Sequence, residues 1–391
     1  MMMTAEQMRS LPEYFSMIQD PRRKQGRRHS LSVVLAIAAA ATLCGMCGYK
    51  AISGWAKNLG QKARERFRCR MEKGRYIIPS MCVIRDVLVR VDPVELDKAL
   101  QKWNEAHDMK DVCLAYDGKT LKNAIDEDGR QTHIVSIVGH DSKATYTQKK
   151  VGTLPVAEDR EEAKRTNEIG MFVPTFDQID IDGKTITADA LLTQKKLATY
   201  LVQRGADYLF TVKGNQGTLL GDVVKHFENR REPECTTIDT GHGRIDTRSI
   251  WTTADLNEYV EFPHVGQAFC INRRSVEKKT GKISNHVFYG ITSKKQDQAN
   301  PKKLMEIHRG HWTIENSSHH ILDRTFDEDK STIRTGHGPA NTTRLRRFAI
   351  GLLKSRGVKD VAQKLRDLHQ RTRTVFDYLV MTEKSREVLT C

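Results

Sequence analysis

Two apolar runs in this chain each end in a carboxylate, and this limits what the chain can fold into. Residues 112–116 read Val-Cys-Leu-Ala-Tyr before Asp117, and residues 185–188 read Thr-Ile-Thr-Ala before Asp189. Both runs have the length and the β-branched and aromatic content of a buried strand. An ionised acid at the end of such a strand is costly unless a partner neutralises it. Each of these acids therefore requires a partner that neutralises it.

A third acid, Glu315, stands in a helical pattern that reads His-Trp-Thr-Ile-Glu-Asn over residues 311–316. Three acids that converge repel one another, and a divalent cation relieves that repulsion. Mg²⁺ takes oxygen ligands and usually keeps waters or substrate phosphate oxygens. The trio therefore suggests metal-dependent chemistry at phosphate. From the residues alone, each acid could instead be a turn or cap residue, since Asp117-Gly118 is itself typical of a turn.

The chain is basic, and its basic residues are clustered. Its 391 residues include 64 Lys and Arg against 49 Asp and Glu, a net charge of +15. Such a balance favours a polyanionic partner, although a basic surface without a nucleic-acid role is the alternative. The two main clusters are Arg22-Arg23-Lys24 with Arg27-Arg28, and the segment from Lys62 to Arg75.

The cysteines and the uncharged stretch near the N-terminus argue against a disulfide-stabilised protein and against a membrane protein. Eight scattered Cys residues argue against a disulfide framework and for a reducing compartment. Cys44 and Cys47 are better explained as small buried thiols than as half of a zinc site. The uncharged residues 31–48 are at the short end for a membrane span and predict a buried helix, so no membrane association is expected.

Residues 1–105 predict a helical, basic N-terminal domain. Apolar helices are expected over residues 31–56, with a break near Gly45–Gly48. Ser80 is placed as the N-cap of a further helix, and another is expected from Pro93 to His107. A basic helical domain suits DNA binding, but a bundle that only braces the core is the alternative.

The hydrophobic period changes at Asp111. Strands are predicted at 112–117, 132–140, 144–151, 185–188 and 207–212, with helices at 164–176 and 194–204. Three antiparallel strands followed by alternating helices and strands are the RNase H-like order. The predicted fold class is therefore mixed α/β, with a mixed sheet and flanking helices.

The interval from Asp189 to Glu315 is 126 residues, too long for a simple connection. After a helix at 217–230, alternation returns, for example at Ile245, Thr247 and Ser249. The expected domains after the N-terminal one are the first part of the core at 106–234, a β-rich insertion at 235–302, and a helical C-terminal part of the core at 303–391 carrying Glu315.

The order Asp, Asp, Glu on a strand, a strand and a late helix resembles the DDE transposases, and the closer resemblance is to insertion-sequence transposases of the H repeat-associated kind. It spans more than 300 residues. The fragments that carry it include Asp20-Pro21-Arg22, Asp117-Gly118-Lys119-Thr120, Gly205-Ala206-Asp207, Lys213-Gly214-Asn215-Gln216, His242-Gly243-Arg244, His311-Trp312, Ile314-Glu315-Asn316 and Leu322-Asp323.

The resemblance implies a DNA transposase with an RNase H-like core. Such an enzyme binds the terminal inverted repeats of its element, acts as an endonuclease there, and joins the freed 3′-OH to target DNA. The implied ligands of two Mg²⁺ ions, with Mn²⁺ as a substitute, are Asp117, Asp189 and Glu315. The resemblance also implies that DNA is the partner and that the protein acts as a homodimer on paired ends. The implied location is the bacterial cytoplasm, in association with the nucleoid. The alternatives are a structure-selective nuclease without strand transfer and a domesticated, non-catalytic DNA-binding protein.

Candidate DNA contacts come from the basic cluster and from residues near the acids. They are Arg22, Arg23, Arg27, Arg28, Lys213, Arg309, His311 and Trp312. Lys213 could instead belong to a helix-entry loop with Asn215 as the cap, and Trp312 could be a core residue. The resemblance also shows departures, because His308 and His311 occupy the slots of a Tyr and an Arg, and Leu322 that of a Lys.

If residues 308–322 form one helix, Glu315 shares a face with residues three, four and seven positions away. That face holds His308, His311, Trp312, His319 and Leu322. It is predicted to lie against the ends of the Asp117 and Asp189 strands. Asp323 is a lesser candidate for the same site.

Overall fold

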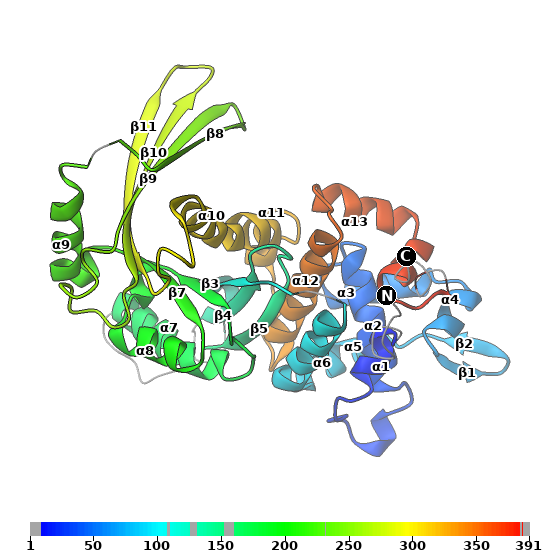
Figure 1. Cartoon of the computed structure of the whole chain (residues 1–391). Coiled ribbons are helices and arrows are strands. Elements are labelled where there is room, and N and C mark those ends of the chain that lie inside the picture. The colour runs from blue at the N-terminus through cyan, green and yellow to red at the C-terminus, as the bar shows by residue number, and fades with distance from the viewer. Residues whose placement is uncertain are drawn as a thin grey trace. The chain divides into compact units, whose positions relative to one another are not determined.

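The computed structural model describes residues 9–107, 110–125, 131–151, 160–230, 232–383 and 385. The chain forms two compact units (Figure 1). The first contains residues 1–110, 118–151 and 314–391, and the second contains residues 111–117 and 152–313. Each unit is therefore built from segments that are far apart in the sequence.

The first unit is mainly helical. Its N-terminal helices are α1 (Leu11–Phe15), α2 (Leu31–Leu43), α3 (Tyr49–Lys57), α4 (Gln61–Arg66), α5 (Met81–Arg90) and α6 (Pro93–Ala106). Its C-terminal helices are α11 (His320–Arg324), α12 (Gly338–Ser355), α13 (Val361–Gln370) and α14 (Arg373–Tyr378).

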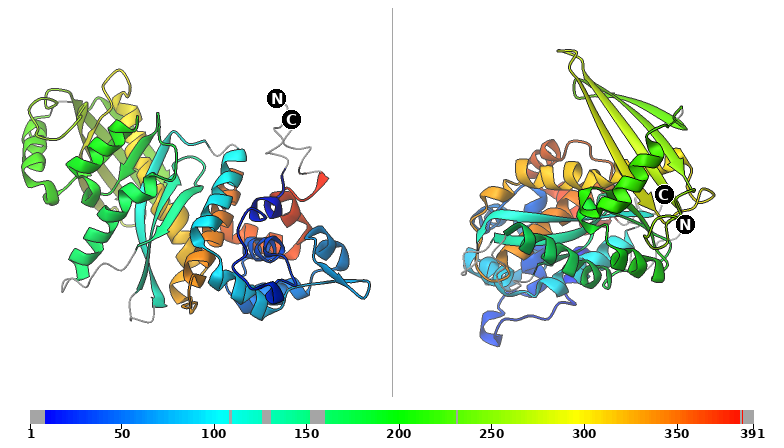
Figure 2. Two further views of the ribbon diagram at one scale, coloured as in Figure 1. Left: turned by 90° about the horizontal axis from the view of Figure 1, so that it is seen from below. Right: turned by 90° about the vertical axis from the view of Figure 1, so that its left-hand side faces the viewer.

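One hydrophobic core joins these two sets of helices. Leu35 of α2 and Phe67 belong to the same buried cluster as Phe348 of α12 and Phe376 of α14. In Figure 2 the blue N-terminal helices accordingly lie among the orange and red C-terminal ones. Burial of this shared apolar surface stabilises both sets together. Residues 1–105 are thus part of a larger unit here, whereas the sequence predicts them as a domain of their own.

In the N-terminal region, the predicted helix break and the predicted Ser80 cap are confirmed, but one hairpin was not predicted. The helices break between Leu43 and Tyr49, and the Ser80 hydroxyl accepts a hydrogen bond from the Val83 amide at 3.4 Å. The basic segment also contains a hairpin that was not predicted, β1 (Arg70–Glu72) and β2 (Arg75–Ile77). Its turn residues Lys73 and Gly74 both have positive φ, as a tight hairpin turn requires. Among the described residues, no helix is long and apolar enough to cross a membrane.

The sheet begins with β3 (Cys113–Ile125), β4 (Gln131–Gly139) and β5 (Thr145–Lys150), and continues with β6 (Thr185–Ala188) and β7 (Asp207–Val212). Its strand order is β5-β4-β3-β6-β7, with β6 parallel to both β3 and β7. This is the mixed sheet of an RNase H-like core, so the predicted fold class is confirmed. The strand that contains Asp117 is longer than predicted, because it continues through Gly118 to Ile125 instead of turning there.

Four further strands extend the second unit. They are β8 (Cys235–Gly241), β9 (Arg244–Thr253), β10 (Gln267–Glu277) and β11 (Ile283–Thr292). The prediction of strands in this region is confirmed. β11 pairs with β7, so these strands continue the core sheet, and the long hairpin of β10 and β11 is visible in Figure 1.

The helices of the second unit are α7 (Arg160–Phe176), α8 (Lys195–Gln203), α9 (Gly217–Phe227) and α10 (Pro301–His311). Phe172 and Phe176 of α7 pack against Tyr116 of β3, with ring centroids 4.9 and 5.7 Å away. α10 contacts β6, β8 and β9, on the other side of the sheet in Figure 1. The sheet around Asp117 and Asp189 is therefore covered by α7 on one face and approached by α10 on the other.

Candidate active site

Asp117 and Asp189 are neighbours on two parallel strands of the second unit. Tyr116 of β3 is paired with Ala188, the last residue of β6, and the two acids are the residues that follow this pair in each segment. Adjacent strands lie about 4.8 Å apart, so the two carboxylates start from closely spaced backbone positions. Side chains alternate between the faces of a strand, and Tyr116 points to α7. Asp117 therefore points to the opposite face, the one approached by α10.

Asp189 directly follows β6 and is the N-cap of a short 3₁₀ helix, Ala190–Leu192. Its Oδ1 accepts a hydrogen bond from the Ala190 amide at 2.6 Å and lies 3.3 Å from Lys213 Nζ. The side chains of Asp189 and Lys213 are 57% and 61% exposed. Asp189 thus has a cationic side chain beside it, and both groups remain open to a ligand.

The segment that contains Lys213 is fastened to the turn after Asp189. Asn215 Nδ2 donates to the Ala190 carbonyl at 2.7 Å, and Gln216 Nε2 donates to the Thr193 carbonyl at 2.8 Å. Asn215 therefore braces the loop instead of capping the next helix. These two hydrogen bonds place Lys213 beside Asp189.

His311 ends α10 and lies on the same face of the sheet. Its Nδ1 is 3.1 Å from Thr187 Oγ1 on β6, two residues before Asp189. Burial lowers the pKa of His311 to about 4. The negative charge of Asp189 raises this pKa, and the positive charge of Lys213 lowers it further. At neutral pH this imidazole is therefore uncharged.

The remaining α10 candidates differ in their surroundings. Arg309 Nη1 forms an ion pair with Asp239 Oδ2 of β8 at 2.6 Å. Trp312 is 45% exposed, so it is not the core residue that the sequence left open. His308 is buried at 7% exposure between Phe269 and Phe288 and serves the core of this unit.

Glu315 lies in the first unit and does not continue α10 as a regular helix. α10 ends at His311, Trp312 is its C-cap, and residues Glu315–His319 form a π-helical turn before α11. The prediction of one unbroken α-helix over 308–322 is therefore wrong. Single π-helical turns are rare and occur frequently at functional sites.

Asp323, the lesser candidate, is held by a strand of the same unit. Its Oδ1 and Oδ2 lie 2.6 and 2.7 Å from Lys119 Nζ on β3. Nothing in the local sequence pattern marks Lys119, although it lies in the Asp117-Gly118-Lys119-Thr120 fragment. Only its partner, 204 residues away, reveals its role.

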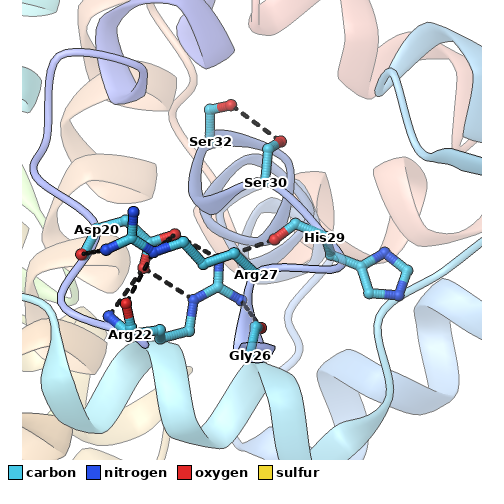
Figure 3. A network of polar contacts seen from close by, with 7 residues as sticks. All are labelled: Asp20, Arg22, Gly26, Arg27, His29, Ser30 and Ser32. Carbon is cyan, nitrogen blue, oxygen red and sulfur yellow. Dashed lines mark hydrogen bonds and ion pairs between the residues drawn. The ribbon is translucent and has the colours of Figure 1, made fainter. Parts of the chain in front are cut away.

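Arg22 organises a loop in the basic cluster (Figure 3). Its guanidinium pairs with Asp20 at 2.8 Å and donates to the carbonyls of Gly26 and His29, and its side chain is 2% exposed. Arg27 donates to the backbone carbonyls of Asp20 and Arg22. Arg22 is thus engaged within the loop, whereas Arg23 and Arg28 are exposed and available to a polyanion.

The donor chemistry of the two neighbouring acids fits a hard divalent cation. Asp117 and Asp189 supply carboxylate oxygens, which Mg²⁺ prefers, and about two protein carboxylates commonly suffice when phosphate oxygens complete the shell. Among the described residues, no three His, Cys, Asp or Glu side chains gather as a metal site. Of the predicted trio, Asp117 and Asp189 belong to the second unit, whereas Glu315 belongs to the first.

The family models and the similar proteins all point to transposases. The family model for the transposase DDE domain matches residues 140–350, and the model described as DDE_Tnp_1-associated matches residues 12–104. "Putative transposase YncI" of Escherichia coli O157:H7 is 29% identical over 90% of this chain and 88% of its own length. "H repeat-associated putative transposase YhhI" of Escherichia coli (strain K12) is 27% identical over 89% of this chain and 91% of its own length.

One solved structure is also similar over most of the chain. It is the "piggyBac transposase synaptic complex with hairpin DNA", with a TM-score of 0.38 and 12% identity over 98% of this chain and 78% of that one. A likeness at this level carries no argument. The chain is thus similar to H repeat-associated putative transposases, and because the family model covers more than half of it, the chain belongs to the DDE transposases.

Proposed function

We propose that this transposase binds the terminal inverted repeats of its own element, cleaves DNA there with Mg²⁺, and joins the freed 3′-OH to target DNA. The observation that carries the proposal is that Asp117 of β3 and Asp189, the residue after β6, both follow the paired residues Tyr116 and Ala188. Two carboxylates on adjacent parallel segments, one within β3 and one just after β6, are costly side by side unless a cation is bound between them. Glu315 is proposed as the third ligand.

Asp117, Asp189 and Glu315 would hold two ions, with Mn²⁺ able to replace Mg²⁺. Bound there, the metal supplies an activated oxygen nucleophile and charge stabilisation at the leaving oxygen. Lys213, exposed beside Asp189, is proposed to hold a phosphate of the bound strand. His311 is uncharged at neutral pH and is proposed to accept or donate a hydrogen bond next to Asp189 instead of pairing with a phosphate.

DNA contacts farther from the acids are proposed at Arg23, Arg28, Arg309 and Trp312. Trp312 has an exposed ring on which a displaced base can stack. Arg309 would have to exchange Asp239 for a phosphate. Arg22 and Arg27 act indirectly in this proposal, because they hold the loop that presents the two exposed arginines. A homodimer on paired ends, in the bacterial cytoplasm, completes the proposal.

A cleavage and strand-transfer assay with the full chain tests this function. The substrate is a labelled duplex that carries the inverted repeat found beside the gene, incubated with target plasmid and Mg²⁺. We expect nicking at the repeat end and covalent joining to the plasmid, both lost in Asp189→Asn. The control variant is Asp180→Asn, a change of the same kind in the loop before β6.

The products distinguish the alternatives. Nicking without joining would identify a nuclease that lacks strand transfer. Binding to the repeat without any Mg²⁺- or Mn²⁺-dependent nicking would contradict the catalytic proposal and identify a DNA-binding protein.

A further inference from the structure

Lys119 and Asp323 form a short ion pair within the first unit. The ammonium of Lys119 lies 2.6 and 2.7 Å from the two carboxylate oxygens of Asp323. The Lys119 side chain is 9% exposed and that of Asp323 is 34% exposed. A lysine this deeply buried is rare unless it is paired, so the two groups depend on each other.

The positions of the two residues in the sequence make this pair informative. Lys119 lies two residues after Asp117 on β3, so both side chains point to the same face of the strand. Asp323 lies eight residues after Glu315 on α11, the helix that follows the π-helical turn. The pair therefore ties the strand of one proposed ligand to the segment that carries another.

Other contacts follow the same course along β3. Lys122 Nζ pairs with Asp329 Oδ2 at 2.6 Å, and Arg334 Nε donates to the Asn123 carbonyl at 3.1 Å. The pKa of His319, within the π-helical turn, is lowered first by burial and then by the positive charge of Arg347. Lys119 is close enough to lower the pKa of His319 as well. The segment after Glu315 thus runs along the second half of β3.

We infer that Lys119 is a positioning residue, which holds the Glu315 segment through Asp323; this inference rests on the proposed function. A π-helical turn is less regular than an α-helix and needs tertiary contacts to fix it. The pair accepts few geometries, because a shift would leave the buried ammonium of Lys119 desolvated and unpaired. Lys119 therefore selects one arrangement of the turn that begins at Glu315.

The Lys122–Asp329 pair is a matched control. It joins the same strand to the same stretch of chain at the same distance, but the Lys122 side chain is 71% exposed. Exposed pairs contribute about 0–1 kcal/mol. If any ion pair along β3 sufficed to fix the Glu315 segment, removing either pair would have the same effect.

Hydrogen exchange of the full chain, without DNA or metal, tests the inference directly. In Lys119→Met and in Asp323→Asn we expect amide exchange in residues 315–324 to rise at least about tenfold, the change that corresponds to about 1.4 kcal/mol. Lys122→Met and Asp329→Asn should change it less than about threefold. The conservative Lys119→Arg and the charge swap Lys119→Asp with Asp323→Lys should restore protection in large part.

The cleavage assay supplies a second readout. Lys119→Met should lower kcat at least about tenfold and leave KM for the repeat duplex unchanged, because positioning acts on the reacting groups and not on DNA binding. Unchanged exchange in 315–324 for both single variants, or no recovery in the charge swap, would overturn the inference. If Lys119→Met does not fold, the nearly isosteric Asp323→Asn decides. A wild type that does not cleave refutes the proposed function alone, since the exchange experiment does not use activity.

Discussion

His308 predicts a specific dependence of stability on pH. Its ring lies 5.9 Å from that of Phe269 and 5.2 Å from that of Phe288, at the core of the second unit. Burial, followed by repulsion from His311 and Arg248, lowers the pKa of His308 to about 3, from an ordinary value of 6.5. The folded protein therefore keeps this ring neutral over a pH range in which the unfolded chain protonates it.

The sign and size follow from that difference. Between pH 6.5 and pH 3 the unfolded state binds the extra proton, so the free energy of unfolding falls as the pH falls. Lowering the pH from 7 to 5 moves the unfolded residue from mostly neutral to mostly charged and costs about 2 kcal/mol. His311, with a pKa of about 4, acts in the same direction. A loss of that size is a substantial share of a stability of about 5–15 kcal/mol.

Urea denaturation at pH 7 and at pH 5 measures the effect. His308→Leu replaces the ring by an apolar side chain of similar volume and removes the titration. We expect the wild type to lose about 2 kcal/mol more than the variant over this pH interval, because other groups titrate alike in both proteins. Equal losses, within about 0.5 kcal/mol, would show that His308 protonates in the folded state and would refute the reasoning.

Three further predictions concern the site and its support. Asp117→Asn, Asp189→Asn and Glu315→Gln should each abolish most Mg²⁺-dependent cleavage in a nicking assay, while a gel shift still shows binding to the repeat. Combining these replacements should reduce cleavage little further, because the three ligands act as one unit. Arg346→Met leaves the fully buried Glu328 carboxylate without its ion-pair partner and should cost about 3–5 kcal/mol in urea denaturation, whereas Lys330→Met, at an exposed pair, should cost less than about 1 kcal/mol. Arg28→Met should reduce the dependence of repeat binding on salt by about one counterion, whereas Arg22→Met should instead lower the unfolding midpoint, because that guanidinium is buried against Asp20.

The sequence predicts those features of the fold that local patterns specify. The run before Asp117 and the run before Asp189 are apolar because both strands lie inside the sheet, and their polar ends mark the edge of that burial. Ser80 is recognisable as a cap because the hydroxyl acts only three residues away. The alternation after Gly241 predicts a strand there, but the burial along β9 does not alternate, whereas that along β8 does.

The features that the sequence did not predict depend on contacts between distant residues. Arg22 looks like part of an exposed basic cluster until Asp20 and the His29 carbonyl are seen to enclose it. Lys119 has no visible partner until β3 and α11 meet. The core shared by α2 and α12 cannot be inferred from the charge pattern of residues 1–105, because that pattern describes only the surface. Side-chain type predicts a candidate, but its partner decides its role.

The segment from His308 to Leu322 shows why spacing alone cannot define the site. The i, i+4 and i+7 rule holds only within one unbroken α-helix. Here α10 ends at His311, and a π-helical turn places one more residue between hydrogen-bonded groups from Glu315 onward. His311 accordingly meets Thr187 in the second unit, while His319 takes its electrostatic neighbours, Arg347 and Lys119, from the first. The spacing rule therefore gives no common face for the two histidines, and the case for Glu315 rests on its carboxylate and on contacts within the first unit that hold its segment, among them the Lys119–Asp323 pair.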